Sequence, residues 1–262
     1  MGISPAFRTG VRPKQSKLSW DRYANACDDL HRRSAAAQLE ELELLANSSL
    51  PVISMSFEAC DDILRSGKYH NYQERMAAGI RVPATPSDHA NRQMVGEKLY
   101  PSFSQHIHYA VLSPDGHGLP TYGSVSLRWQ VVDSYLLARS SLLEDNSFTF
   151  FEKHNLGRLH SLVPVGYQAV WEERAKLVVA KLAGSVSSAT AMAQLPDLLL
   201  QRGESRPNDE FVEIAIFAKD GFDTKDVDMI TIETRPTTSD EMHRWEIIKS
   251  SAGARSPPID VT

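Results

Sequence analysis

The chain has 262 residues, of which 42% are hydrophobic and 23% charged, and this composition excludes a wholly disordered protein. The length suits one large domain or two small ones. Its 28 basic and 33 acidic side chains give a net charge of −5, so a surface built to bind nucleic acid is not expected. No stretch approaches the roughly 20 apolar residues that a membrane span needs.

Both ends of the chain have the composition of flexible tails. Residues 1–17 carry four basic side chains, two prolines and no acid, and they lack the apolar core of a secretory signal. Two interpretations stay open for them, a mobile terminus and an export leader. Residues 250–262 contain glycine, paired proline and little to bury, so a second flexible tail is expected. A single ordered domain is therefore predicted over residues 18–249.

The first part of this domain is predicted to contain two helices and a strand. Residues 19–45 predict a helix, because a candidate N-cap and early acids precede an imperfect apolar stripe. Residues 51–57 have a strand-like pattern, and residues 58–65 predict a short helix ended by Gly67. Residues 69–98 are polar and irregular, which is typical of a functional loop or a disordered insertion.

The remainder of the domain is dominated by predicted strands. Residues 168–183 predict the best helix in the chain, and residues 189–200 predict a helix interrupted by Pro196. Early and central helices, distributed strands and the lack of regular alternation favour an α+β domain with a mostly antiparallel sheet. The predicted strands are residues 106–112, 121–129, 147–151, 210–217 and 227–233.

The most unusual residue in these strands is Glu213. Because strand side chains alternate, Val212 and Ile214 share one face, and Phe211, Glu213 and Ala215 share the other. Every neighbour of Glu213 is apolar, and an unpaired carboxylate there would cost several kcal/mol or stay protonated. Three interpretations remain open: a structural ion pair, a sheet edge that faces water, or the wall of a cleft where the carboxylate is chemically useful.

Seven short segments place this residue in a wider pattern. In order they are ISMSF (53–57), ILRSGKY (63–69), HNYQER (70–75), PTYGSVSL (120–127), SFTF (147–150), EFVEIAI (210–216) and DVDMI (226–230). Taken in this order and spacing, the chain resembles bacterial NAD-dependent mono-ADP-ribosyltransferases over residues 50–233. Each segment is short, so the order and spacing carry the resemblance.

The resemblance implies both a fold and an activity. The expected fold is α+β, an ADP-ribosyltransferase-like split antiparallel β-sandwich with flanking helices and NAD folded in a cleft. The expected activity is that of a secreted bacterial effector, which transfers ADP-ribose from NAD to a host protein in the host cytoplasm. General similarity to type III-secreted effectors that modify a threonine of ubiquitin makes ubiquitin a candidate acceptor. A non-catalytic interaction protein on the same scaffold is the alternative.

The resemblance also implies roles for individual residues. Glu213 corresponds to the family's catalytic glutamate, which stabilises the cationic sugar formed when nicotinamide leaves. The second acid of the common pattern is replaced by Phe211, which counts against arginine as the acceptor. The Ser-Thr-Ser-like element corresponds either to residues 147–149 or to the loop around residues 71–79. The candidate NAD-binding residues are Arg75, Asn71, Tyr122, Thr149 and Arg81.

These NAD-binding candidates differ in what supports them. Strand residues 52–57 contain no arginine, so Arg75 or Arg81 is expected to contact the pyrophosphate. Tyr122 opens a predicted strand, where its ring could stack on nicotinamide. A solvated arginine and a tyrosine in the sheet core are the structural alternatives, and they stay open.

Two histidines suggest a third function. His106 and His108 alternate on one predicted strand, which places both rings on the same face and makes a metal pair geometrically possible. No closely spaced acid or cysteine completes a familiar site, although Asp115 and His117 are nearby. A metal-dependent hydrolase is therefore the least favoured alternative, and no metal is expected.

Overall fold

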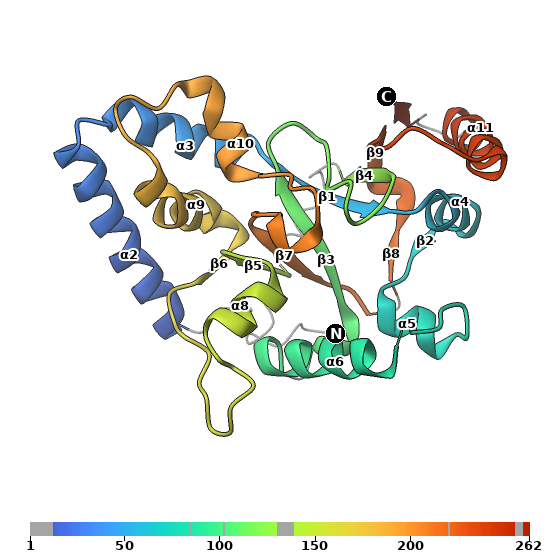
Figure 1. The fold of residues 1–262 in the computed structure, drawn as a ribbon, viewed down its shortest axis with the longest axis horizontal. Coiled ribbons are helices and arrows are strands. Elements are labelled where there is room, and N and C mark those ends of the chain that lie inside the picture. Colours follow the sequence, from blue (N-terminus) through green and yellow to red (C-terminus); the bar gives the residue numbers. More distant parts are fainter. Residues whose placement is uncertain (1–12, 84, 102, 130–138, 220, 255–258) are drawn as a thin grey trace.

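The computed structural model describes the chain apart from residues 1–12, 84, 102, 130–138, 220 and 255–258. In this part of the chain, eight strands form one mixed sheet that is flanked by helices (Figure 1). The α+β class predicted from the sequence is therefore confirmed. The predicted leader lies mainly outside the described residues, although residues 13–17 already belong to the first described helix.

The strand order of the main sheet is β10-β9-β4-β1-β3-β7-β5-β6, and all neighbours are antiparallel except the parallel pair β9 and β10. Two short strands, β2 and β8, pair with each other outside this sheet. The strands are β1 (Leu50–Met55), β2 (Lys68–Tyr69), β3 (Ile107–Ser113), β4 (Val125–Trp129), β5 (Ser140–Leu143), β6 (Gln168–Val170), β7 (Glu213–Phe217), β8 (Phe222–Asp223), β9 (Val227–Ile232) and β10 (Asp260–Val261).

The helices form three groups around the sheet. The helices α2, α3, α9 and α10 pack together at the β5–β6 end, and α4 packs with α11 near β9 and β10 (Figure 1). The helices α5, α6 and α8 lie along a third side, below the sheet in this view. Their bounds are α2 (Pro13–Arg32), α3 (Ala36–Ser48), α4 (Phe57–Ser66), α5 (Tyr72–Ala77), α6 (Pro86–Leu99), α8 (Ser147–Lys153), α9 (Arg174–Leu182), α10 (Leu195–Leu199) and α11 (Ser239–Gly253).

The sheet divides into two halves between β1 and β3. These strands share only three residue pairs, which join Leu50 to Ser113, Pro51 to Leu112 and Val52 to Val111. Beyond this seam β1 continues along β4, whereas β3 continues along β7. One half is therefore β10-β9-β4-β1 and the other is β3-β7-β5-β6. Among the described residues, the backbone hydrogen bonds join both halves in one eight-stranded sheet.

The two faces of β7 belong to different hydrophobic clusters. Ile214 and Ile216 point into the large core that the helices α2, α3 and α9 share with the sheet. Ala215 points into a second cluster, which α6 and α8 close with Leu99 and Phe150. Because side chains alternate along a strand, the side chain of the first residue of β7 lies on the α6–α8 side.

Several predicted elements are confirmed to within a few residues. The helix over residues 58–65 is α4, and Gly67 ends it with φ = 74°, the left-handed conformation that favours glycine. The strands predicted over residues 51–57, 106–112, 210–217 and 227–233 are β1, β3, β7 and β9. Each of these strands has a run of apolar residues that the structure buries.

The helix predicted over residues 19–45 is wrong in its extent. It is two helices, α2 and α3, separated at Ser34, which has φ = 56°. Ser19 lies inside α2 and is buried, so it does not cap the helix. A single residue in the left-handed region is enough to change the direction of the chain. The apolar stripe in the sequence does not reveal this break.

The polar loop predicted over residues 69–98 is also wrong, because it contains the helices α5 and α6. Asn71 caps α5 in a capping box with Glu74, and the side chain of Thr85 caps α6 ahead of Pro86. None of the residues of α5 is buried, so the helix has no apolar stripe to reveal it. Capping signals, rather than hydrophobic periodicity, mark these two helices.

Three other predictions need correction. Residues 147–151 are not a strand but the start of α8, where Asn146 accepts hydrogen bonds from the first turn. The helix predicted over residues 168–183 begins as strand β6, and the α-helix α9 starts only at Arg174. The flexible tail predicted over residues 250–262 is ordered at both ends, since α11 continues to Gly253 and β10 pairs with β9.

Gly123 allows the turn before β4 to pack directly on the backbone of β1. A Cβ atom at this position would overlap the carbonyl group of Met55. We therefore expect Gly123→Ala to lower the free energy of unfolding by about 2 kcal/mol or more, measured by urea denaturation. Gly184→Ala is the matched control, because nothing lies within 4 Å of its added Cβ. Equal effects of the two substitutions would contradict this account.

Candidate active site

A cleft of about 950 Å³ opens where β1 and β3 diverge beyond their short seam. Ser54 and Met55 of β1 line one side, and Ile107 and His108 of β3 line the other. The helices α4, α5 and α6 and the start of α8 complete the walls. The structure brings all of the predicted site residues to this cleft, namely Glu213, Arg75, Asn71, Tyr122, Thr149 and Arg81.

Glu213 is the first residue of β7 and lies opposite Val111 of β3 and Leu143 of β5. Its side chain is 4% exposed. The backbone N–H and the hydroxyl of Ser147 both donate to Oε2, at 3.3 Å and 3.2 Å. Its Oε1 is buried and has no hydrogen-bond partner among the described residues. Of the three interpretations of this residue, the structure therefore places it in the wall of a cleft.

Burial raises the pKa of Glu213 to about 8, although the two hydrogen bonds from Ser147 oppose this shift. The carboxyl group is therefore largely protonated at neutral pH when nothing occupies the cleft. A positive charge placed beside it would favour ionisation. The phenol of Tyr122 is close enough to sense Glu213, and burial together with that carboxylate raises the pKa of Tyr122 to about 12.

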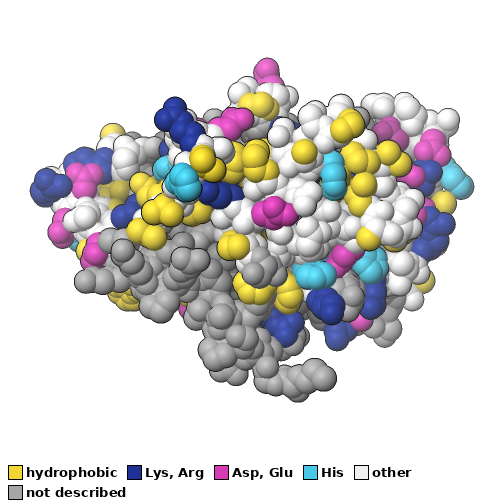
Figure 2. Space-filling view, turned by 90° about the horizontal axis from the view of Figure 1, so that it is seen from below, with side chains coloured by type: hydrophobic (Ala, Val, Ile, Leu, Met, Phe, Trp, Pro, Cys, Tyr) yellow, Lys and Arg dark blue, Asp and Glu magenta, His cyan; other side chains and the backbone are white. Residues whose placement is uncertain are grey.

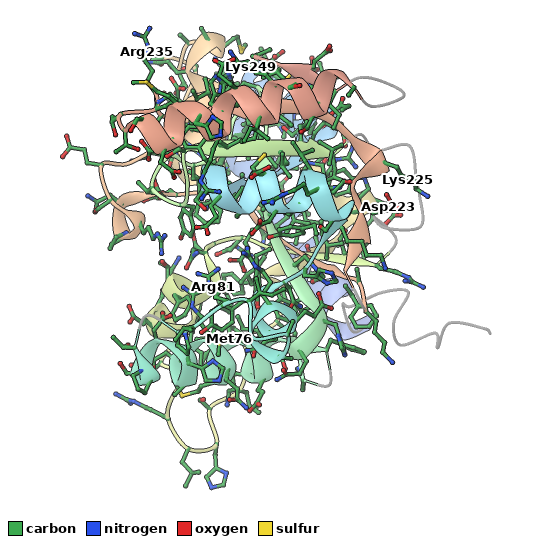
Figure 3. All side chains as sticks on the ribbon, turned by 90° about the vertical axis from the view of Figure 1, so that its right-hand side faces the viewer. Met76, Arg81, Asp223, Lys225, Arg235 and Lys249 are labelled. Carbon is green, nitrogen blue, oxygen red and sulfur yellow. The ribbon has the colours of Figure 1, made fainter. Side chains whose placement is uncertain are left out.

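Basic side chains gather along α5, α6 and the connection between them, which form the arginine wall of the cleft. The guanidinium groups of Arg81 and Arg92 lie over the ring of Tyr72, at 5.0 Å and 5.2 Å from its centre. Figure 3 shows Arg81 between the α4 and α6 layers. Seen from below, the described surface of this side carries Lys, Arg and His side chains next to hydrophobic ones (Figure 2).

The positive charge on this wall is only partly compensated. Arg92 pairs with Asp88 at 3.0 Å, and Arg75 lies 3.9 Å from Asp62. Arg81 makes no ion pair with a described residue. Burial, followed by the nearby charges of Arg92 and Arg75, lowers the pKa of Arg81. This mutual repulsion favours the binding of an anion with more than one negative oxygen.

Tyr122 lies in the turn before β4 and not in the strand where it was predicted. Its hydroxyl accepts a hydrogen bond from the amide of Asn146 at 3.1 Å, and its ring packs edge-on against Phe211. The guanidinium of Arg206 lies 4.7 Å from the ring centre. Tyr122 is half-buried, so its aromatic surface is shared between the protein and the cleft.

The remaining two candidates differ in how available they are. The amide of Asn71 is fully engaged, since its Oδ1 accepts from the N–H of Glu74 at 2.8 Å and its Nδ2 donates to the carbonyl of Gln105 at 2.9 Å. Asn71 therefore fixes α5 rather than offering its side chain to a ligand. Thr149 is exposed on the first turn of α8, at the edge of the cleft.

The two segments predicted as candidates for the Ser-Thr-Ser-like element lie in different parts of the cleft. Ser147 contacts Glu213 directly, whereas α5, within residues 71–79, lies on the wall of the arginines. Arg92 and Arg206 were missed from the sequence. Arg92 lies in the segment that was predicted to be an irregular loop, and no helix or strand was predicted around Arg206. The sequence therefore provided no reason to place these two side chains beside the cleft.

The histidine pair proposed from the sequence does not form a metal site. His106 precedes β3 in a short 3-10 helix, and His108 is buried within the strand. Among the residues that the structure describes, no group of three or more His, Cys, Asp or Glu side chains is arranged to hold a metal ion. The hydrolase alternative therefore gains no support from the described residues.

Comparison with known proteins adds no assignment. The sequence matches no protein-family model and no curated protein. In the described part of the chain, none of the helices combines the length and the apolar character needed to cross a membrane. The function must therefore be argued from the residues and geometry of the cleft.

The raised pKa of Glu213 predicts a pH-dependent contribution to stability. The folded protein holds this proton up to about pH 8, and the unfolded chain releases it near pH 4.5. The contribution is therefore full below pH 4.5 and is lost as the pH rises to about 8. The free energy of unfolding of the wild type minus that of Glu213→Gln should fall by up to about 1.4 kcal/mol per pH unit across this window.

Urea denaturation at several pH values measures this difference, and subtraction removes the titration of other groups. Glu246→Gln on the exposed face of α11 is the control, because it removes a surface carboxyl group, paired with Lys249, that does not line the cleft. A flat profile for Glu213→Gln would show that Glu213 is already ionised in the folded protein.

Proposed function

We propose that this protein is an NAD-dependent mono-ADP-ribosyltransferase, with an ADP-ribosyltransferase-like split sheet as its scaffold. One observation carries the proposal. The buried carboxyl of Glu213, with an unpartnered Oε1, lines the same cleft as Arg75, Arg81 and Arg92. An acid and clustered guanidinium groups in one cleft match the two charged parts of NAD, which are the cationic nicotinamide glycoside and the pyrophosphate.

The chemistry requires a negative group beside the nicotinamide ribose. The bond between the ribose C1′ and the nicotinamide nitrogen breaks, its electron pair stays on nitrogen, and positive charge develops on the sugar. An ionised Glu213 would stabilise this charge, and Oε1 can accept a hydrogen bond from a ribose hydroxyl. The pyridinium of bound NAD favours the ionised carboxylate, which counteracts the raised pKa in the empty cleft.

The acceptor completes the reaction by forming a bond to C1′ and losing a proton. Phe211, which stands where the second acid of arginine-modifying relatives would be, is 2% exposed and packs against Tyr122. Residue 211 therefore supplies no carboxylate that could orient or deprotonate the guanidinium of an acceptor arginine. This supports a hydroxyl acceptor, and a threonine of ubiquitin is the candidate that the sequence resemblance suggests.

The pyrophosphate would be bound by the arginine wall. Arg81 has no paired acid among the described residues, and Arg75 is only loosely paired, so both can form charge-assisted hydrogen bonds. Arg92 extends this wall, although Asp88 offsets its charge. Tyr122 can offer part of its ring to the nicotinamide. We further infer that the protein is a secreted bacterial effector acting in the host cytoplasm.

Substitution of the catalytic acid tests the proposal directly. We expect Glu213→Gln to lower NAD-dependent transfer at least about 100-fold, because the amide cannot stabilise a developing cation. Nicotinamide release from NAD and labelling of a host lysate, with added ubiquitin, are the measurements. Circular dichroism checks that the variant is folded, and Glu246→Gln on α11 should keep full activity.

The result also separates the two candidate functions. Loss of activity in Glu213→Gln alone supports the transferase. Full activity in this variant would exclude the mechanism, and a wild-type protein that releases no nicotinamide with any lysate would favour a non-catalytic interaction protein on the same scaffold.

A second prediction concerns the arginine wall. Arg81→Ala should raise KM for NAD by about tenfold and leave kcat within about twofold, because the guanidinium binds the pyrophosphate equally in ground and transition states. Arg244→Ala on α11 removes the same charge far from the cleft lining and should leave KM unchanged. A fall in kcat with unchanged KM in Arg81→Ala would instead place this arginine at the reacting bond.

A further inference from the structure

A cluster of titratable side chains lies at the α5 end of the cleft. Three imidazole rings, from three different segments, lie close to the carboxylate of Glu74. His70 Nδ1 lies 3.4 Å from Oε2, His108 Nε2 lies 3.5 Å from Oε2, and His106 Nδ1 lies 3.7 Å from Oε1. His70 follows β2, His106 belongs to the 3-10 helix before β3, and His108 belongs to β3. His70 and His108 line the cleft itself.

Glu74 stays ionised across the physiological pH range. Burial alone would raise its pKa, but hydrogen bonding to His108 and to backbone N–H groups outweighs burial and lowers the pKa to about 2. The backbone N–H of Asn71 donates to Oε2 at 3.0 Å, and that of Gly221 donates to Oε1 at 3.3 Å. Gly221 has φ = 74°, a conformation that suits glycine and aims this N–H at the carboxylate.

The charge of the cluster is therefore set by its histidines. With three neutral imidazoles the cluster carries the single negative charge of Glu74. An imidazole can be neutral or protonated, so the net charge of the cluster depends on how many protons its rings hold. One proton on the rings of His70, His106 and His108 neutralises the cluster, and a second makes it cationic.

Other polar and charged groups lie around the cluster. Arg75 follows Glu74 on α5, and Asp62 of α4 lies 3.9 Å from Arg75. The ring of Tyr69 of β2 lies tilted against that of His108, with 5.3 Å between ring centres. Burial raises the pKa of Tyr69 to about 12, so it stays neutral.

Further groups surround the cluster and the arginine wall. Phe217 of β7 presents an apolar ring edge to His106, and Asp223 and Lys225 follow Gly221 in the chain (Figure 3). His89 of α6 is a separate histidine on the arginine wall, because its Nδ1 lies 3.4 Å from the hydroxyl of Tyr72, over whose ring Arg81 and Arg92 lie. The cluster differs from His89 in that its three imidazoles share one carboxylate, that of Glu74.

We propose that the cluster of His70, Glu74, His106 and His108 makes the anion affinity of the arginine wall depend on pH, with tighter binding at acidic pH. The identity of the anion as the pyrophosphate of NAD rests on the proposed function. The physical basis is electrostatic, since protons taken up beside Arg75 and Arg81 add positive charge in a partly buried cleft, where solvent screens it only weakly.

The experiment uses full-length Glu213→Gln, which prevents turnover of NAD and removes the titration of Glu213 itself. Binding of NAD is measured by calorimetry at about pH 8 and about pH 6, and binding of sulfate by its effect on Tm at the same pH values. The pyrophosphate diester of NAD and the sulfate ion both keep their charge across this range. Affinity for each should be on the order of 3- to 10-fold higher at the lower pH.

Substitution of the two partly exposed histidines isolates the cluster. Adding both His70→Gln and His106→Gln should remove most of the pH dependence, and adding His70→Gln alone should remove part of it. The side chains of His70 and His106 are 37% and 33% exposed, so the fold should tolerate both substitutions. Adding His243→Gln, on the exposed side of α11, should leave the pH dependence unchanged.

The outcomes separate this inference from the proposed function. Equal affinity at both pH values, or an unchanged pH dependence in the double histidine substitution, would overturn the inference while NAD binding still supports the transferase. If sulfate binds with the expected pH dependence but NAD does not bind, the inference is supported and the transferase proposal fails. Failure of both ligands to bind overturns both.

Discussion

Three residue pairs between β1 and β3 hold the two halves of the sheet together, and the position of the cleft depends on this short seam. Beyond Val52, the backbone groups of β1 pair with β4, and those of β3 pair with β7. Each strand thus keeps a hydrogen-bonded neighbour on its outer edge, so the two halves can diverge along their inner edges. The divergence creates a cavity lined by regular strands, so its walls are held rigidly while helices close it from outside.

The electrostatics of the cleft follow from what each wall is made of. The β7 wall is a packed sheet covered by α6 and α8, so Glu213 lies in an apolar environment and its pKa rises to about 8. The α5 wall is built from half-buried elements at the edge of the fold, where several arginines lie close together and burial lowers the pKa of Arg81. Glu74 stabilises this wall through the capping box of α5 and through its contacts with three histidines. The same carboxylate also contributes a negative charge beside the arginines.

The sequence predicted best those elements whose side chains alternate between two apolar environments. It identified β7 and the unusual placement of Glu213, because the apolar residues around this acid are its neighbours in the sequence. It missed α5, α6 and α11, because these helices bury few side chains and lack an apolar stripe. Their capping residues, such as Asn71 with Glu74 and Thr238 with Glu241, were the available signal, and hydrophobic periodicity does not detect it.

By itself, the sequence determined the α+β class, the approximate positions of several main strands and the choice of Glu213 as the candidate central acid, because local alternation and apolar neighbours encode these features. Only the tertiary structure decided that Ser147 contacts this acid, that Asn71 is engaged in holding α5, and that Arg92 and the histidines around Glu74 border the same cleft. These contacts join segments tens of residues apart in the chain. Their geometry depends on how the two halves of the sheet diverge and how the helices pack on them, which no local pattern records.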